Sequence, residues 1–417
     1  MARTRLSRAL ALAALLLLGG TGASPAVLAQ VGSAGGQRAT GSCPDRVVAK
    51  QHLDPSRVFL EGVAAISPTD VWAVGVIGTT SAGASGTTMA LIEHYDGKTW
   101  CAMDTHDRGD DGLGGGANLH AVTAVSARDV WAAGTVIEHW DGRAWTVIPP
   151  SPSEGWLTSL SASSADNVWA SNGGFVERWD GRHWREVPLP IAEEVFPGTI
   201  ATISPSDAWL GGLGRHYGLI PQAQHWDGQH WQAMQLPRTP APASYSTGLR
   251  ATCTVPDPMD PDLPAIAALG PNDVWAVGYQ TSEDGSMICP LAWHWDGRRW
   301  HEVWLVTGGQ DLGLLERTDD TGNPGDGWGL QLMAATPSGQ LWALNDPELF
   351  ALHFDGHGWH VVTAFTGPKN AEGFDLTAIS ASSDDDVWAV TNEAPSPWNA
   401  YHWDGKTWRG VSAIPAG

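Results

Sequence analysis

The sequence is poor in charged residues, and above all in positive ones. Only 16% of its 417 residues are charged, and 45 Asp and Glu stand against 23 Lys and Arg, which gives a formal net charge of −22 at pH 7. A surface of this sign repels the phosphate backbone of nucleic acids. The composition therefore argues against a nucleic-acid-binding protein and leaves solubility outside the cell, a cation or a basic partner as explanations of the charge.

The chain also lacks long apolar runs and any sustained helical periodicity beyond its first residues. Ala9–Leu18 is apolar but too short to span a bilayer. It follows three arginines within the first eight residues and precedes a small-residue cleavage pattern at 27–29, as in a secretory signal peptide. We therefore expect residues 1–29 to be removed and the mature protein to be secreted, extracellular and free of membrane spans.

Cysteine is scarce, with four residues in the whole chain. No C-x-x-C spacing occurs, which argues against a metal or redox site. An even number of cysteines in an oxidising compartment predicts two disulfide bonds. Of the three possible pairings we favour Cys43–Cys101 and Cys253–Cys289, because each ties a terminus or a loop to nearby structure.

Tryptophan is abundant, with 24 residues against 7 Phe and 5 Tyr, and much of it belongs to a repeat. One element of the repeat is typified by DVWAVG and the other by HWDGKTW. The second element occurs seven times, at 94–100, 139–145, 178–184, 225–231, 294–300, 353–359 and 402–408. A stretch of small residues ending in a turn precedes each first element, as in GVAAISPTD at 62–70. Each unit therefore contains four segments in a fixed order.

Each segment of the unit has the local chemistry of a strand. Asp-Gly between strand-forming residues is a strong hairpin signal, because glycine tolerates positive φ. Ser-Pro-Thr-Asp favours a type I turn between the first two segments. Four antiparallel strands repeated seven times predict an all-β, seven-bladed β-propeller over residues 59–417. Residues 30–58 form a leader and an N-terminal clasp in this interpretation.

The DVWAVG and HWDG repeats resemble those of secreted bacterial β-propellers. The D-G-K-T-W hairpin also resembles the Asp-box (BNR) hairpin of sialidase-like propellers, in its hairpin pattern only. The resemblance covers nearly all of the mature chain and implies the propeller fold, without implying an activity.

The recurring histidines of the repeat could suggest a ring of metal ligands. One histidine per blade places them too far apart to share an ion, so we expect them to form structural hydrogen bonds. The Asp, Gly and Trp of the hairpin are expected to be structural too, with Trp packing one blade on the next. The six histidines are His94, His139, His225, His294, His353 and His402.

The candidate binding residues fall in the insertions, which occur between the second and third strands of a unit or between units and all lie on the face opposite the repeated turns. Function on a propeller is expected where loops vary on a rigid scaffold. Trp156, Trp328 and Trp398 lie outside the repeat and could stack on sugar rings or anchor a protein. Local packing of these tryptophans within the loops is the plainer alternative.

Two groups of polar residues could hold a cation. Asp107, Asp110 and Asp111 lie close together in HDRGDDGLGGG and could form a Ca²⁺ loop, although their spacing is not that of an EF-hand. A solvated loop is the alternative. The starts of the first strands would meet at the mouth of the central channel, where the candidate channel or metal residues are Glu61, His120, Gln331 and Asp375.

Three functions remain open at this point. We favour an exported interaction module that recognises an extracellular protein through its loop face. A lectin-like propeller that binds an extracellular glycan is the first alternative. A metal-dependent hydrolase at the channel mouth is the second, although no nucleophile elbow, Cys–His pair or zinc motif is present, so we favour a non-enzyme. No cofactor is expected other than Ca²⁺, and we expect a monomer.

Overall fold

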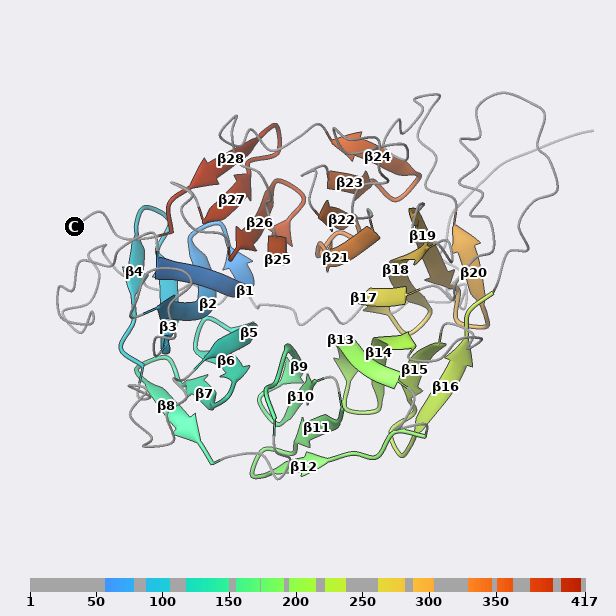
Figure 1. Ribbon diagram of the computed structural model, residues 1–417, viewed down its shortest axis with the longest axis horizontal. Coiled ribbons are helices and arrows are strands. Elements are labelled where there is room, and N and C mark those ends of the chain that lie inside the picture. The colour runs from blue at the N-terminus through green and yellow to red at the C-terminus, as the bar shows by residue number, and fades with distance from the viewer. Residues whose placement is uncertain are drawn as a thin grey trace, which may run out of the picture.

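The computed structural model describes thirteen segments of the chain, and Figure 1 shows them arranged as a ring of sheets around a central axis. The described residues are 57–78, 88–105, 118–149, 155–172, 174–190, 195–214, 222–237, 262–281, 288–303, 329–346, 351–362, 376–392 and 399–413. They contain no α-helix and form seven antiparallel four-stranded sheets. The protein is a seven-bladed β-propeller, as the repeat predicted.

The first four blades take their strands consecutively from the chain. Blade 1 consists of β1 (Val58–Ser67), β2 (Asp70–Gly78), β3 (Thr88–Tyr95) and β4 (Trp100–Ala102). Blade 2 consists of β5 (Leu119–Ser126), β6 (Asp129–Gly134), β7 (Ile137–Trp140) and β8 (Trp145–Ile148). Blade 3 consists of β9 (Ser159–Ser164), β10 (Asn167–Ser171), β11 (Val176–Trp179) and β12 (Trp184–Glu186). Blade 4 consists of β13 (Val195–Ser204), β14 (Asp207–Gly214), β15 (Gln222–Trp226) and β16 (Trp231–Gln235).

The last three blades follow the same plan. Blade 5 consists of β17 (Asp262–Gly270), β18 (Asp273–Thr281), β19 (Ile288–Trp295) and β20 (Trp300–Val303). Blade 6 consists of β21 (Gly329–Ala335), β22 (Leu341–Asp346), β23 (Ala351–Phe354) and β24 (Trp359–Val362). Blade 7 consists of β25 (Leu376–Ser383), β26 (Asp386–Thr391), β27 (Ala400–Trp403) and β28 (Trp408–Val411). Strands β2, β3, β18 and β19 are longer than their counterparts in most other blades.

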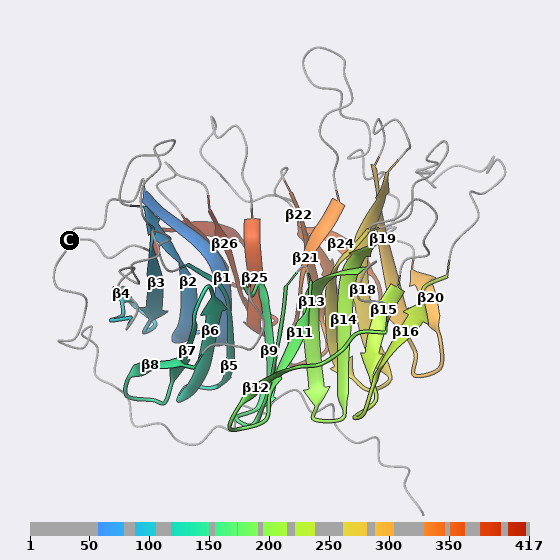
Figure 2. The same ribbon diagram turned by 60° about the horizontal axis from the view of Figure 1, so that its bottom comes forward.

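The first strand of every blade lies at the centre of the ring and the fourth at its rim (Figure 1). Each first strand contacts the first strand of the next blade, and β25 contacts β1 to close the ring. The tight turns between strands one and two and between strands three and four lie at the same end of the blades (Figure 2). The predicted division into a turn face and a loop face follows from this strand order.

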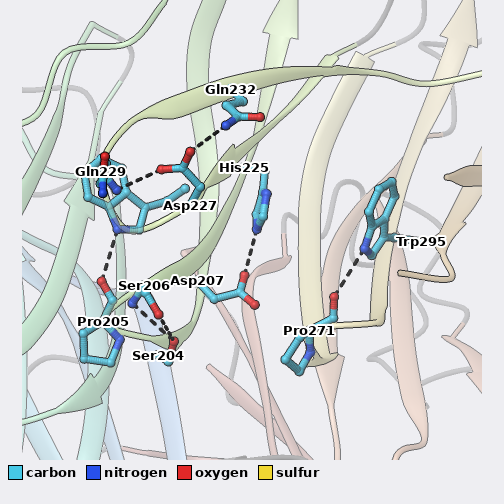
Figure 3. Close-up of polar contacts among 11 residues, drawn as sticks. Ser204, Pro205, Ser206, Asp207, His225, Asp227, Gln229, Gln232, Pro271 and Trp295 are labelled. Atoms are coloured by element: carbon cyan, nitrogen blue, oxygen red, sulfur yellow. Dashed lines mark hydrogen bonds and ion pairs between the residues drawn. The ribbon is translucent and has the colours of Figure 1, made fainter. Parts of the chain in front are cut away.

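The repeated Asp-Gly turns are held by one carboxylate each. In blade 4 the Oδ1 atom of Asp227 accepts a hydrogen bond from the backbone N–H group of Gln229 at 2.8 Å (Figure 3). It accepts a second from the backbone N–H group of His230, also at 2.8 Å, and Gly228 has a φ of 95°. These hydrogen bonds lower the pKa of the Asp227 carboxyl. The same arrangement recurs in all seven blades. The Asp of HWDG is therefore structural, as predicted.

The recurring histidines link the third strand to the start of the second. His225 in β15 donates from Nε2 to Oδ1 of Asp207 at 3.0 Å (Figure 3), and its ring stacks on Trp209 with a centroid distance of 4.2 Å. Equivalent hydrogen bonds occur in blades 1, 2, 5 and 7, and Gln340 replaces the aspartate in blade 6. In blade 3 the histidine is replaced by Arg178, whose guanidinium lies over the ring of Trp169 at 5.2 Å. The structural role predicted for the six histidines is confirmed.

The blades are joined by tryptophans. The second-strand indole of each blade packs against two aromatic rings of the next blade, one that ends its third strand and one that begins its fourth. Trp72 of blade 1 contacts Trp140 and Trp145 of blade 2, each with a centroid distance of 5.3 Å, and the contact with Trp145 is edge-to-face. This contact recurs around the ring. The predicted role of Trp in packing blade on blade is confirmed.

The ring closes through the same contact, without exchange of a strand. Trp388 of blade 7 packs against Tyr95 and Trp100 of blade 1, at centroid distances of 5.2 and 5.5 Å. The hydroxyl of Thr377 also donates to the backbone carbonyl of Leu60 at 2.8 Å. Closure therefore depends on side-chain packing and hydrogen bonds between the first and last blades.

The small polar residues of the inner strands also connect neighbouring blades. Ser159 and Ser161 of β9 accept hydrogen bonds from the backbone N–H groups of Ile200 and Thr202 in β13, at 3.1 and 2.9 Å. Ser380 of β25 accepts one from Ala65 of β1 at 3.0 Å. Side-chain hydroxyl groups therefore form hydrogen bonds between neighbouring inner strands, which belong to separate sheets.

Of the four cysteines in the predicted disulfide bonds, the structure describes the side chain of one. Cys101 is buried in β4 and is disulfide-bonded. Cys43 and Cys253 lie outside the described residues, and the side chain of Cys289 in β19 does too. Both pairings therefore stay predictions.

The glycine that ends DVWAVG is required by a close backbone approach. A Cβ atom on Gly75 would lie 2.0 Å from the carbonyl oxygen of Phe59 in β1, far inside van der Waals contact. We expect Gly75→Ala to lower the free energy of unfolding by about 1–3 kcal/mol, because the inner strand must shift to admit the methyl group. Chemical denaturation measures this. Gly358→Ala is the matched control, since a Cβ there meets nothing within 4 Å, and equal stabilities of the two variants would contradict the argument.

Glu93 gives the fold a pH dependence. Its side chain in β3 is fully buried, neither carboxyl oxygen has a hydrogen-bond partner among the described residues, and burial raises its pKa well above the ordinary value. Such a carboxyl group has a higher pKa in the folded state than in the unfolded state, where it is about 4.5. Its contribution to the stability of the fold is fully present below pH 4.5 and is lost as the pH rises through the folded-state pKa.

We therefore expect Glu93→Gln to gain stability relative to the unmodified protein as the pH rises from about 4.5 towards neutral and alkaline values. Gln224 already occupies the equivalent buried position in blade 4. Denaturation across this pH range measures the difference. Glu186→Gln at an exposed position serves as the control, and parallel stability profiles for Glu93→Gln and the unmodified protein would refute the prediction.

Candidate functional site

The inner strands are irregular where they begin, on the loop face. The register of β1 with β2 shifts between Leu60 and Gly62, which leaves Glu61 as an extra residue, and β5 shifts in the same way around His120. An extra residue of this kind changes the direction of its side chain relative to the ladder. Gln331 occupies the same position in blade 6. Three of the predicted channel residues therefore share one structural position.

Glu61 connects blade 1 to blade 7. Its half-buried carboxyl accepts a hydrogen bond from the side chain of Asn392, which follows β26. Burial raises the pKa of the Glu61 carboxyl, and the hydrogen bond from Asn392 opposes this by a smaller amount. The result is a carboxyl group that is easier to protonate than a solvated one and has a fixed position.

His120 and Trp156 connect blade 2 to blade 3. The indole of Trp156, just before β9, stacks on the imidazole of His120 with a centroid distance of 6.0 Å and an interplanar angle of 26°. Burial lowers the pKa of His120, and its Nε2 atom is buried without a hydrogen-bond partner in the described part of the chain. Burial therefore favours the neutral imidazole of His120, and its Nε2 atom is enclosed beside the indole of Trp156.

Trp156 is the most exposed large apolar side chain of the described residues. Its exposed fraction is 61%, and Val147 on the outer strand β8 follows with 46%. Trp293, which also lies outside the repeat, is by contrast buried between blades 4 and 5. Trp156 therefore presents one ring face to solvent while the other lies over His120.

The backbones of Glu61 and His120 lie close together. Gly62, next to Glu61, packs so tightly that a Cβ atom there would lie 3.1 Å from the carbonyl oxygen of His120. We call Glu61, Asn392, His120 and Trp156 the mouth cluster. It combines a carboxyl group and a neutral imidazole on the neighbouring inner strands β1 and β5 with an exposed aromatic face that precedes β9.

The structure does not test all of the predicted site residues. Trp328, Trp398 and Asp375 lie outside the described residues, as do the three aspartates of the predicted calcium loop, Asp107, Asp110 and Asp111. Gln331 is half-buried in blade 6 and is separated from blade 1 by blade 7. Among the residues that the structure describes, no three His, Cys, Asp or Glu side chains gather as ligands for a metal ion.

Asn392 is the member of the mouth cluster that sequence reasoning missed. It directly follows the DVWAVT segment of blade 7, on the loop face. Every blade has a residue at this position of the repeat, directly after the second strand, so the position alone marked Asn392 as a loop-face residue. Its contact with Glu61 could not be predicted in this way, because it depends on the closure of the ring, which brings blade 7 against blade 1.

The fold and the mouth cluster define the class of this protein, a seven-bladed β-propeller with an aromatic residue exposed where the inner strands begin. No protein-family model and no curated protein sequence matches the chain. None of the described segments forms a helix with the length and hydrophobicity needed to cross a bilayer.

Several solved structures resemble the chain at low sequence identity. YCF48 bound to D1 peptide is 17% identical over 81% of this chain and 92% of that one, with a TM-score of 0.48. The extracellular domain of the putative one component system BT4673 from B. thetaiotaomicron is 11% identical over 81% of this chain and 38% of that one, with a TM-score of 0.48. U3-55K is 10% identical over 85% and 94%, with a TM-score of 0.49. These similarities are too distant to assign a ligand or a partner.

The buried position of His120 can be checked directly. We expect its imidazole to titrate below the usual value of about 6.5, because burial disfavours the charged form. NMR of protein labelled at the histidine Cε1 carbon measures this titration, and the His120→Gln variant assigns the signal. A midpoint at or above 6.5 would show that the imidazole is solvated or paired with an acid.

Proposed function

We propose that the protein is an exported interaction module that binds a segment of an extracellular protein at its mouth cluster. The exposed indole of Trp156, fixed by its stacking on His120, is the observation that carries the proposal. Tryptophan anchors contribute a large share of the energy in many protein interfaces, because they bury much area at a small entropic cost. A rigid, preorganised anchor lowers the cost of binding further.

Polar groups beside the anchor would give the site its selectivity. The half-buried carboxyl group of Glu61 can bond a polar group of a peptide. The partner segment would therefore carry an apolar or aromatic side chain beside a hydrogen-bonding group.

Export rests on the signal-peptide pattern of residues 1–29 and fits the resemblance to secreted bacterial propellers. The negative net charge supports a soluble role outside the cell. The extracellular location belongs to the proposal.

The mouth cluster also supports a glycan ligand as the second candidate. An exposed indole backed by a second ring is a flat apolar surface on which a sugar ring can stack. This alternative involves the same residues, so a test of Trp156 applies to both ligands.

We expect Trp156→Ala to weaken binding by about tenfold or more, because it removes the anchor. Val147→Ala is the matched control, since it shortens the other strongly exposed apolar side chain. Proteins enriched on the immobilised protein from the secreted fraction of its source are compared between the two variants, and the affinity of each purified partner is then measured. A partner that binds both variants equally does not use the mouth cluster.

A glycan array read with calcium and with chelator decides between the two ligands. Binding to related glycans that depends on Trp156 would replace the protein partner with a sugar. Calcium dependence would locate that binding at an acidic loop. A blank array, together with a protein partner lost in Trp156→Ala, supports the proposal as stated.

A further inference from the structure

A second surface, far from the mouth cluster, lies at the rim between blades 4 and 5. A cleft of about 480 Å³ runs along the end of β16 and the residues after it on one side, and along the turn between β19 and β20 on the other. Apolar side chains line it, and two arginines flank them. The residues that line the cleft include Met234, Leu236, Pro237, Trp295, Arg298 and Arg299.

The walls of the cleft are fixed by hydrogen bonds between and within the two blades. The indole N–H of Trp293 in blade 5 donates to the carbonyl oxygen of Pro237 at 3.3 Å, which ties the chain after β16 to the neighbouring blade. The indole N–H of Trp295 donates to the carbonyl oxygen of Pro271 at 3.3 Å (Figure 3). The apolar floor is therefore preorganised.

The two arginines are a departure from the repeat. Of the seven Asp-Gly turns, blade 5 has the sequence with two successive arginines, DGRRW. The backbone N–H groups of Arg298 and Arg299 both donate to Asp296 Oδ1 at 2.9 Å, so the turn holds both residues in place. Both side chains are exposed on a chain whose net charge is strongly negative.

The carboxylate of the same turn, Asp296, is already paired. In blades 3 and 7 the turn aspartate pairs with an arginine of the fourth strand, as Arg185 does with Asp180 at 3.0 Å. In blade 5 the corresponding residue is His301, which lies 2.6 Å from Asp296 Oδ2. Neither guanidinium group, of Arg298 or of Arg299, forms an ion pair within the described part of the chain.

The outer strand of blade 4, which borders the cleft, also offers backbone hydrogen-bonding groups to a ligand. β16 is the last strand of its sheet, so one of its edges is unpaired among the described strands. An extended peptide can pair with such an edge and place alternate side chains into neighbouring pockets. Guanidinium groups bind carboxylates with two parallel hydrogen bonds, which suits acidic side chains on that peptide.

We propose that this cleft binds an extended, acidic segment of a partner protein, with an apolar side chain on the floor and carboxylates on Arg298 and Arg299. The apolar floor favours a peptide over a small inorganic anion. The net charge of the chain disfavours a long polyanion such as nucleic acid. This site is separate from the mouth cluster, so either can fail without the other.

The test uses a short fluorescein-labelled peptide in which glutamate alternates with leucine, and its counterpart with glutamine in place of glutamate. Fluorescence anisotropy should show the acidic peptide binding more tightly than its counterpart, and more weakly as salt is raised. The Arg298→Glu/Arg299→Glu variant should lose about tenfold or more in affinity for the acidic peptide. The matched control is Arg143→Glu/Arg182→Glu, which reverses two charges at the equivalent turns of blades 2 and 3 and should change the affinity less than about twofold.

A second measurement covers the case in which the double variant fails to fold. The same peptide with photo-leucine, cross-linked to the unmodified protein, should label the segment that contains Met234 and Pro237. Cross-links elsewhere, equal losses in both double variants, or no preference for glutamate would overturn the proposal. Competition by inorganic sulfate as strong as that by the peptide would make the cleft a simple anion site and overturn it too. Loss of a dimer in Arg298→Glu/Arg299→Glu would assign the cleft to a second copy of the chain instead.

Discussion

This propeller depends on the packing of one tryptophan of each blade against two aromatic rings of the next blade. Antiparallel sheets standing around an axis share no backbone ladder, so side chains must join them. Trp72 shows the arrangement, with one ring edge-to-face and another tilted against it. The same indole also carries the stacked His94 of its own blade. The indole of Trp72 therefore packs both on the next blade and on a histidine that is hydrogen-bonded within its own blade.

The centre of the ring is held by a different device, which has consequences for the mouth cluster. Hydroxyl groups such as that of Ser161 hydrogen-bond the backbone of the neighbouring inner strand, and Gly75 permits the close approach of the inner strand to the second. Several inner strands have a register shift at their loop-face end, and Glu61 and His120 occupy two of these positions. The scaffold thus places these two polar side chains where the inner strands begin.

The two proposed sites follow from departures from the repeat. Trp156 is exposed in a molecule whose other described tryptophans are buried or half-buried, and Arg298 with Arg299 places positive charge on an acidic chain. A repeat fixes the scaffold, and residues that the scaffold does not need are available for recognition. The mouth cluster and the rim cleft lie in different parts of the molecule, so the protein could hold two partners at once.

The blades could be predicted from the amino-acid sequence, because each blade is a local unit. Asp-Gly turns, alternating strand residues and the recurring Trp and His act within a few tens of residues, so the strands, the turn face and the structural role of His225 were all predictable. The contacts between residues of different blades became known only from the folded chain. Asn392 reaches Glu61 through ring closure, Trp156 lies over His120 across a blade boundary, and the rim cleft needs two blades side by side. These contacts join residues that no local pattern relates, since they depend on the angle at which one blade packs on the next.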